Sequence, residues 1–291
     1  MKINLAKSAG FCFGVKRALN IAQQTLNSHR KVYMLGDIVH NNDVIRDIKK
    51  AGIKKIKRLG LGKNKILLIR AHGACLNTFK RARQLGYHII DATCPMVKEI
   101  HKIAAEMENN GYRVIVIGDK KHEEVQGIIG QLKHKAIVLN DIKNLPFKSI
   151  KKMKKACIVV QSTQNLEKVI KIVGVLRQFI KELKFFNTIC RPTRIKQEEI
   201  KTMPRNYDLM IIIGSKTSAN TKRLYEISKS LNSRSYWVGS KKEIKPRWFK
   251  DVKTVGVTAG ASTPDYTTRE IIKYIKQKSA ASPHAFSNAG L

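Results

Sequence analysis

Residues 66–117 read ILLIRAHGACLNTFKRARQLGYHIIDATCPMVKEIHKIAAEMENNGYRVIVI, and this stretch decides the fold class. Three short apolar runs, at 66–69, 87–90 and 113–117, alternate with two longer segments in which apolar residues recur at helical spacing. Each longer segment ends at a glycine, which is a usual signal for the end of a helix. Strands that alternate with helices of this length form βαβ units, whose strands pair in parallel.

The same alternation continues in both directions along the chain. Further strand candidates, with helical patterns between them, lie at 32–35, 136–139, 157–160, 209–213, 235–238 and 254–257. The sequence therefore predicts an α/β protein built from small parallel sheets.

Length and composition are those of a globular protein. The 291 residues predict two or three domains, and 43% of them are hydrophobic. The longest apolar runs have five to six residues, which is too short to span a membrane. The first ten residues, MKINLAKSAG, lack the apolar core of a secretory signal. We expect a cytoplasmic protein with no membrane partner.

The charge is unusual, because 57 Lys+Arg against 21 Asp+Glu give a net charge of +36. One interpretation is compositional drift, since the lysines are spread along the whole chain. The other is a partner of opposite sign, either nucleic acid or an acidic ligand or protein. No aromatic-studded basic tract of a nucleic-acid module is present, so we expect nucleic-acid binding to be at most nonspecific.

Five cysteines without a CxxC spacing exclude a disulfide framework and a local zinc or ferredoxin motif. Cys75 and Cys157 fit structural roles, and Cys157 opens an apolar strand. The other three, Cys12, Cys94 and Cys190, lie in glycine- or proline-flanked turns. From the residues alone these three are nucleophiles, metal ligands or structural residues.

The three turn cysteines divide the chain into similar intervals, each with about three strands. This predicts α/β domains at 13–94, at 95–190, and at 191–278 together with 1–12, followed by a flexible tail at 279–291.

Polar and reactive residues follow the predicted strands, where open parallel sheets bind ligands. They include three histidines, a cysteine, a glutamate and several hydroxyl or amide side chains: His40, His72, Cys94, His122, Glu124, Ser162, Thr163, Ser218, Asn220 and Ser262. Any one Ser, Thr or Asn here is explained as a helix N-cap. Histidines together with helix N-termini suit an anion, which favours a phosphorylated ligand.

The order of these motifs resembles the 4-hydroxy-3-methylbut-2-enyl diphosphate reductase family, the last enzymes of the methylerythritol phosphate route to isoprenoids. The motifs are GFCFGVKRA, VHN, AHG, DATCP, HEEVQG, QST, GSKTSANT and GVTAGASTPD, and the resemblance covers residues 1 to about 278. It implies three α/β domains arranged as a trefoil around a central iron–sulfur cluster. It also implies two-electron reductive dehydroxylation of an allylic diphosphate to isopentenyl and dimethylallyl diphosphate.

The resemblance also implies residue roles. Cys12, Cys94 and Cys190 match the ligands of one 4Fe–4S cluster per chain with one open iron, and Glu124 matches the proton-relay residue. Eight residues are expected to bind substrate: His40, His72, His122, Ser162, Thr163, Ser218, Asn220 and Ser262. The implied electron donor is an acidic flavodoxin or ferredoxin with its NADPH reductase, which the basic surface suits.

Four positions depart from the family pattern. The family usually has the motif HPE where this chain has HEE, so Glu123 is the middle residue of that motif. Ser162 replaces a threonine, and Lys196 replaces an arginine. Ala219 stands where some members have a second serine. Two other functions stay open from the residues: a basic nucleic-acid-binding protein with incidental cysteines, and a zinc hydrolase that would need a further ligand beside three distant thiolates.

Overall fold

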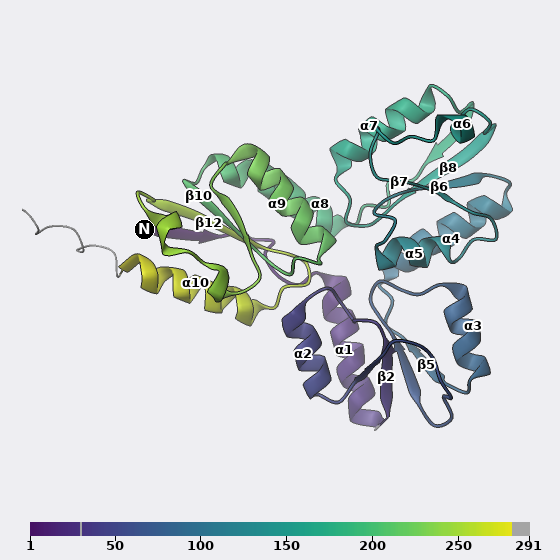
Figure 1. Ribbon diagram of the computed structural model, residues 1–291, viewed down its shortest axis with the longest axis horizontal. Coiled ribbons are helices and arrows are strands. Elements are labelled where there is room, and N and C mark those ends of the chain that lie inside the picture. Colours follow the sequence, from purple (N-terminus) through teal and green to yellow (C-terminus); the bar gives the residue numbers. More distant parts are fainter. Residues whose placement is uncertain (30, 281–291) are drawn as a thin grey trace, which may run out of the picture. The chain divides into compact units, whose positions relative to one another are not determined.

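The computed structural model describes residues 1–29 and 31–280, which pack as two compact units (Figure 1). The larger unit comprises Cys12–His40 and Val44–Arg194. The smaller unit comprises Met1–Phe11, Asn41–Asp43 and residues 195–280.

The smaller unit holds one four-stranded sheet in the order β1-β12-β10-β11, and its strand pairs are parallel. The strands are β1 (Lys2–Leu5), β10 (Leu209–Ile213), β11 (Ser235–Val238) and β12 (Thr254–Ala259). The helices are α8 (Arg191–Thr202), which begins in the larger unit, η1 (Met203–Arg205), α9 (Ala219–Leu231), η2 (Lys241–Glu243), η3 (Pro246–Phe249) and α10 (Asp265–Ala280).

The larger unit holds two parallel four-stranded sheets. The first has the order β3-β2-β4-β5 and the second the order β7-β6-β8-β9. The first sheet consists of β2 (Val32–Leu35), β3 (Lys54–Ile56), β4 (Ile66–Ile69) and β5 (His88–Asp91), with α1 (Phe13–Ser28), α2 (Asn42–Lys50) and α3 (Leu76–Gln84). The second consists of β6 (Arg113–Ile117), β7 (Ile137–Leu139), β8 (Lys155–Val160) and β9 (Glu182–Phe185), with α4 (Pro95–Asn109), α5 (Glu123–Ile129), α6 (Phe147–Ile150) and α7 (Leu166–Arg177).

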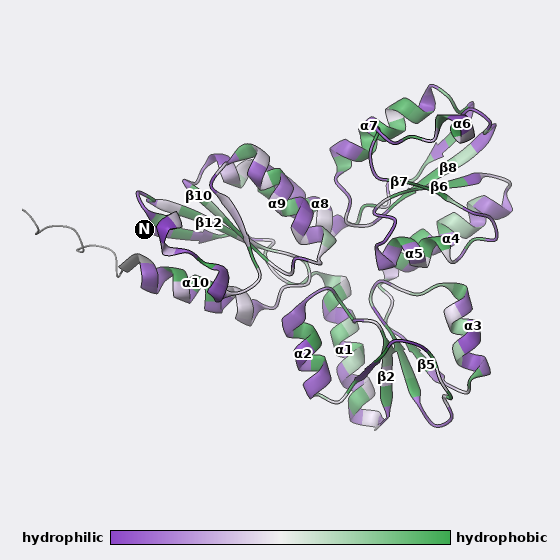
Figure 2. Ribbon diagram, viewed as in Figure 1, coloured by the Kyte–Doolittle hydropathy of each residue, from purple (hydrophilic) through white to green (hydrophobic). Residues whose placement is uncertain are grey.

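Alternating side chains of the central strands fill a core on each face of a sheet. In β6, Ile115 and Ile117 pack toward α6 and α7, whereas Val114 and Val116 pack toward α4 and α5. The strands are accordingly apolar while the helices carry both hydrophobic and hydrophilic residues (Figure 2). Burial on both faces is what makes a parallel strand read as a continuous apolar run.

The predicted α/β class and parallel sheets are confirmed. Each predicted domain segment contains one sheet, with β1 joining the strands of the last segment. The domain boundaries and the trefoil arrangement stay predictions. Helix α10 continues to Ala280, and the rest of the predicted tail, 281–291, lies outside the described residues.

Among the described residues, the structure has no helix that is both long enough and apolar enough to cross a membrane.

Candidate functional site

Four cysteines of the larger unit stand directly before a helix: Cys75 precedes α3, and the other three are the turn cysteines. Cys12 precedes α1, Cys94 precedes α4 and Cys190 precedes α8. Pro95 at the first position of α4 fixes the backbone for the helix start. All five cysteines of the chain are free thiols. The first turns of α1, α4 and α8 therefore present three thiols beside unpaired helical N–H groups, which stabilise negatively charged sulfur.

These thiols lie close enough to interact electrostatically. Burial raises the pKa of Cys94, and the neighbouring Cys12 and Glu124 raise it further. Burial also raises the pKa of Cys190 to about 11, again with contributions from Glu124 and Cys12. A Cβ placed on Gly14 would come within 2.6 Å of the Cys94 Sγ and 3.9 Å of the Cys12 Sγ. A side chain at position 14 would therefore fill the space between two of the thiols.

Backbone hydrogen bonds connect these cysteines to the other polar loops. The Cys94 N–H donates to the Ala71 carbonyl (3.0 Å), beside His72. The Cys190 N–H donates to the Ser162 carbonyl (3.0 Å). The Arg17 guanidinium donates to the Thr93 carbonyl (3.1 Å), which links α1 to the loop that carries Cys94. The sulfur positions are thus set by the loops after β4, β5 and β8.

Glu124 is a buried carboxyl held by a single residue. It is 1% exposed, and it accepts hydrogen bonds from the Ser162 N–H (2.6 Å) and the Ser162 Oγ (2.8 Å). Burial raises the pKa of Glu124, while the two hydrogen bonds from Ser162 oppose the rise. A carboxyl in this setting can hold a proton and release it to an adjacent group.

Three histidines from three loops form a cluster. The ring centroids of His40 and His72 are 4.5 Å apart and stacked, and that of His122 lies 5.0 and 5.4 Å from them. One ring nitrogen from each lies within 4.8 Å of the others. Burial lowers the pKa of both His40 and His72. The spacing suits one ligand shared by the three rings, either an anion or a metal ion.

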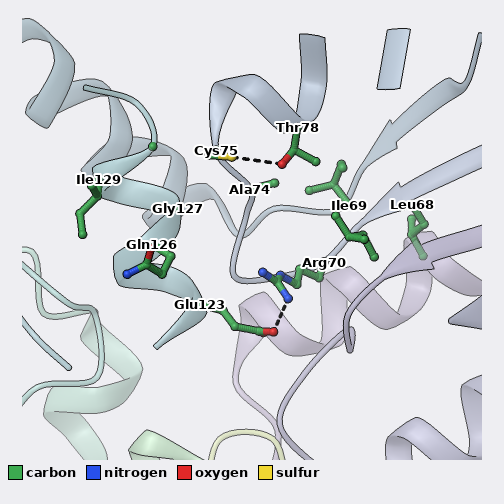
Figure 3. A pocket seen from close by; sticks show the side chains of 12 residues that line it. Leu68, Ile69, Arg70, Ala74, Cys75, Thr78, Glu123, Gln126, Gly127 and Ile129 are labelled. Carbon is green, nitrogen blue, oxygen red and sulfur yellow. Dashed lines mark hydrogen bonds and ion pairs between the residues drawn. The ribbon is translucent and has the colours of Figure 1, made fainter. Parts of the chain in front are cut away.

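Glu123 and Arg70 stand beside this cluster. The Arg70 guanidinium pairs with one carboxylate oxygen of Glu123, and the other oxygen lies 3.7 Å from His40 Nε2 and from His72 Nδ1. Figure 3 shows the pair at the edge of a cavity of about 290 Å³ between β4 and α5. Glu123, the first departure, therefore faces the histidine cluster, and no pattern in the sequence points to its partner Arg70.

The smaller unit has its own polar group at the ends of β10 and β12. Ser218 caps α9 by accepting from the Thr221 N–H (3.3 Å). Asn220 Oδ1 accepts from the Ala261 N–H (2.9 Å), which joins the two loops beside buried Ser262. Asn220 Nδ2 is buried and has no hydrogen-bond partner. This group offers neutral hydroxyl and amide donors.

Two of the remaining departures have structural explanations. Lys196 is buried in the smaller unit, where its ammonium donates to the carbonyls of Ser8 and Ala259. Ser162 keeps the hydroxyl that binds Glu124. Ala219 is the buried first residue of α9, and nothing in the structure explains its difference from the family pattern.

The larger unit brings together nine of the predicted site residues: three cysteines, three histidines, Glu124, Ser162 and Thr163. The Thr163 hydroxyl accepts from Gln161 Nε2 (3.1 Å), so it has a local partner. Ser218, Asn220 and Ser262 belong to the smaller unit. Of the two cysteines expected to be structural, Cys157 is fully buried, while Cys75 is partly buried and lines the cavity.

Comparison with known proteins identifies similar chains. The family described as LytB protein matches residues 3–276. A 4-hydroxy-3-methylbut-2-enyl diphosphate reductase of Aquifex aeolicus is 39% identical over 279 residues, which cover 94% of this chain and 96% of the relative. The same reductase of Geobacter metallireducens is also 39% identical, covering 97% and 99%.

Solved structures agree. A structure of (E)-4-hydroxy-3-methyl-but-2-enyl diphosphate reductase, the terminal enzyme of the non-mevalonate pathway, matches with a TM-score of 0.70 and 38% identity over 95% of this chain and 99% of that one. The E-1-hydroxy-2-methyl-but-2-enyl-4-diphosphate reductase of Plasmodium falciparum matches with a TM-score of 0.86 and 27% identity, covering 94% and 87%.

Proposed function

The chain belongs to the LytB family, and from that membership we propose that it reduces 4-hydroxy-3-methylbut-2-enyl diphosphate in the last step of the non-mevalonate route to isoprenoids. The substrate is an allylic alcohol that carries a diphosphate. Two electrons and two protons remove its hydroxyl as water and leave isopentenyl or dimethylallyl diphosphate.

Cys12, Cys94 and Cys190 are proposed to hold a 4Fe–4S cluster. Three thiols within one unit are the donor type that iron–sulfur clusters take, and the missing side chain of Gly14 leaves room between two of them. Burial keeps the free Cys94 and Cys190 thiols protonated, so loading the cluster releases protons. When bound, a cluster held by three cysteines supplies the electrons and an open iron that acts as a Lewis acid.

Glu124 is proposed to deliver the proton that lets the hydroxyl leave. Among the residues gathered in the larger unit it is the buried carboxyl whose charge acts on both Cys94 and Cys190. Ser162 fixes both carboxyl oxygens, so the proton is held at a defined place. This is the observation that carries the mechanism, because hydroxide is a poor leaving group without a proton.

The three histidines are proposed to bind the diphosphate. Burial lowers the pKa of His40 and His72, and an approaching diphosphate supplies the negative charge that favours their protonated, donating form. Ser162 and Thr163 are proposed to face the substrate near its hydroxyl. Ser218, Asn220 and Ser262 are proposed to add neutral donors, of which the unpartnered Asn220 amide is the clearest.

The electron donor is proposed to be a small acidic flavodoxin or ferredoxin with its NADPH reductase, since a chain of net charge +36 attracts acidic proteins. The place of action is proposed to be the cytoplasm, where the five free cysteines stay reduced.

The test is anaerobic reconstitution followed by analysis of iron and acid-labile sulfide. We expect about four of each per chain, and turnover of the substrate with a chemically reduced viologen dye. A folded chain that takes up little iron would contradict the cluster assignment. Equimolar zinc in the protein as isolated would instead favour hydrolytic zinc chemistry.

A further inference from the structure

Glu123 occupies a position that an anionic ligand would take. It is the first residue of α5, and its carboxylate faces three groups that can carry positive charge: Arg70, His40 and His72. Its Oε2 atom is buried and has no hydrogen-bond partner, because 3.7 Å is too long for a hydrogen bond to either imidazole. The pairing of Oε1 with Arg70 keeps this oxygen beside the two imidazoles.

The surroundings are shaped for this pair. A Cβ at Gly36 would collide with the Arg70 guanidinium and lie 3.3 Å from Glu123 Oε1. Gly36 also has a φ of +83°, a backbone conformation that favours glycine. The loop after β2, which also carries His40, therefore leaves space for the Arg70–Glu123 pair.

We propose that Glu123 is an internal competitor for the substrate's diphosphate: in the free protein its carboxylate neutralises Arg70 and stands against His40 and His72, where a phosphate group of the substrate would otherwise bind. This inference rests on the proposed function, because it takes the histidine cluster as the diphosphate subsite. It makes Arg70 a further residue of that subsite and Glu123 a residue that sets its affinity.

Two opposing electrostatic effects of Glu123 have to be compared. Its carboxylate repels a bound diphosphate and pairs with Arg70, and both effects weaken binding. It also raises the pKa of His40, together with Asp37, against the lowering effects of burial and of Arg70. The pKa of His72 is lowered by burial and, to a smaller extent, by its neighbours His40, His122 and Arg70. A bound diphosphate raises the proton affinity of the same imidazoles and so replaces this favourable effect of Glu123. The repulsion between the diphosphate and a carboxylate that keeps its place remains as the net effect, and it weakens binding.

The adjoining cavity gives the carboxylate somewhere to go. Arg70 and Glu123 both line the cavity of about 290 Å³, together with Gln126, Cys75 and Thr78 (Figure 3). When diphosphate occupies the histidine cluster, rotation of the Glu123 side chain into this space would relieve the repulsion without moving α5. Product that leaves the site would then be replaced by the same carboxylate.

The test is the affinity of the cluster-loaded enzyme for inorganic diphosphate, measured by calorimetry, in the wild type and in Glu123→Gln. Removing the charge should tighten diphosphate binding about tenfold and lower the KM for substrate by a similar factor. Glu167→Gln is the matched control, because it removes the same charge from the exposed first turn of α7; its affinity should stay within about twofold of the wild type.

A second variant keeps the inference testable if Glu123→Gln does not fold. Glu123→Pro also removes the carboxylate, and proline is favoured at the first position of a helix, so α5 should still form. Unchanged or weaker diphosphate binding in a folded Glu123→Gln or Glu123→Pro protein would overturn the inference. If inorganic diphosphate fails to bind even the wild type, the proposed diphosphate subsite itself is wrong.

Discussion

The two units carry different chemistry at the carboxyl ends of their strands. The larger unit gathers thiols, imidazoles and the buried carboxyl of Glu124, all of which change protonation or bind metals. The described part of the smaller unit offers Ser218, Asn220 and Ser262, which are neutral. The difference teaches that one fold pattern, a parallel sheet with helices, can present groups that exchange protons or bind metals in one unit and neutral hydrogen-bonding groups in the other. Variants of the thiols and of Glu124 in the larger unit should therefore affect chemistry, and variants in the smaller unit should affect binding.

The largest expected effect is loss of the cluster on changing a thiol of the larger unit. Cys94→Ala should abolish cluster assembly and turnover, because two cysteines cannot hold three irons. Iron and sulfide analysis after anaerobic reconstitution measures this. Cys157→Ala, the buried cysteine of β8, is the control and should load normally. A full cluster in Cys94→Ala would remove Cys94 from the ligand set.

The next effect concerns the proton of Glu124. Glu124→Gln keeps the shape of the side chain but has no carboxyl proton to give, so kcat should fall by about 10²- to 10⁴-fold. Iron content and inorganic diphosphate affinity should change little. Steady-state kinetics with a viologen donor measures this, and near-normal turnover would exclude Glu124 as the proton source.

The third prediction is that acid lowers the stability of the larger unit more than that of the smaller unit. Burial lowers the pKa of His101 in the larger unit to about 4, against 6.5 when unperturbed. A lowered pKa means stability that is present above pH 6.5 and is lost as the pH falls toward 4, which amounts to about 2 kcal/mol between pH 7 and 5. The described smaller unit contains no histidine. Acid should therefore weaken the larger unit selectively.

The chain supplies its own probe for that experiment. Both tryptophans, Trp237 and Trp248, lie in the smaller unit, so their fluorescence follows that unit, while circular dichroism follows both. In urea titrations of the cluster-free chain, the dichroism change should move to lower urea at pH 5 while the fluorescence transition stays. His101→Gln should reduce the shift. Transitions that move together at both pH values would contradict the assignment.

The smallest effect is expected in the smaller unit. Asn220→Asp keeps the oxygen that accepts from the Ala261 N–H but replaces the unpartnered amide donor by a second, charged oxygen. The KM should rise about tenfold, because a phosphate would face repulsion in place of a donor, while kcat stays close to that of the wild type. Asn20→Asp, an exposed change on α1, is the control. A fall in kcat at constant KM would place Asn220 in the chemistry instead.

The sequence predicts the two central strands of each sheet and three of the six edge strands, β5, β7 and β11. Both central strands of every sheet, such as β6 and β8, were predicted from their apolar runs. The strands missed, β1, β3 and β9, are all edge strands. An edge strand has fewer neighbours, so residues such as Lys54 and Lys55 of β3 can stay exposed, and no apolar run marks the strand.

The candidate site follows the same logic. Its histidines and Glu124 could be found because they directly follow predicted strands. Arg70 and Gly14 could not, since the role of each depends on a contact made by folding: Arg70 pairs with Glu123, and Gly14 lies beside the Cys94 thiol. The position of Asn41–Asp43 in the smaller unit likewise has no signal in the sequence.

The exposed lysines that leave some edge strands without an apolar run also affect solubility. One edge strand of each sheet carries an exposed lysine: Lys2 on β1, Lys54 on β3 and Lys184 on β9. An open edge has unpaired backbone groups that invite strands of another copy, and like charges on both copies repel that approach. Salt screens such repulsion over about 10 Å at 0.1 M ionic strength. A lysine-rich composition thus acts as a barrier to aggregation, and concentrated salt weakens that barrier.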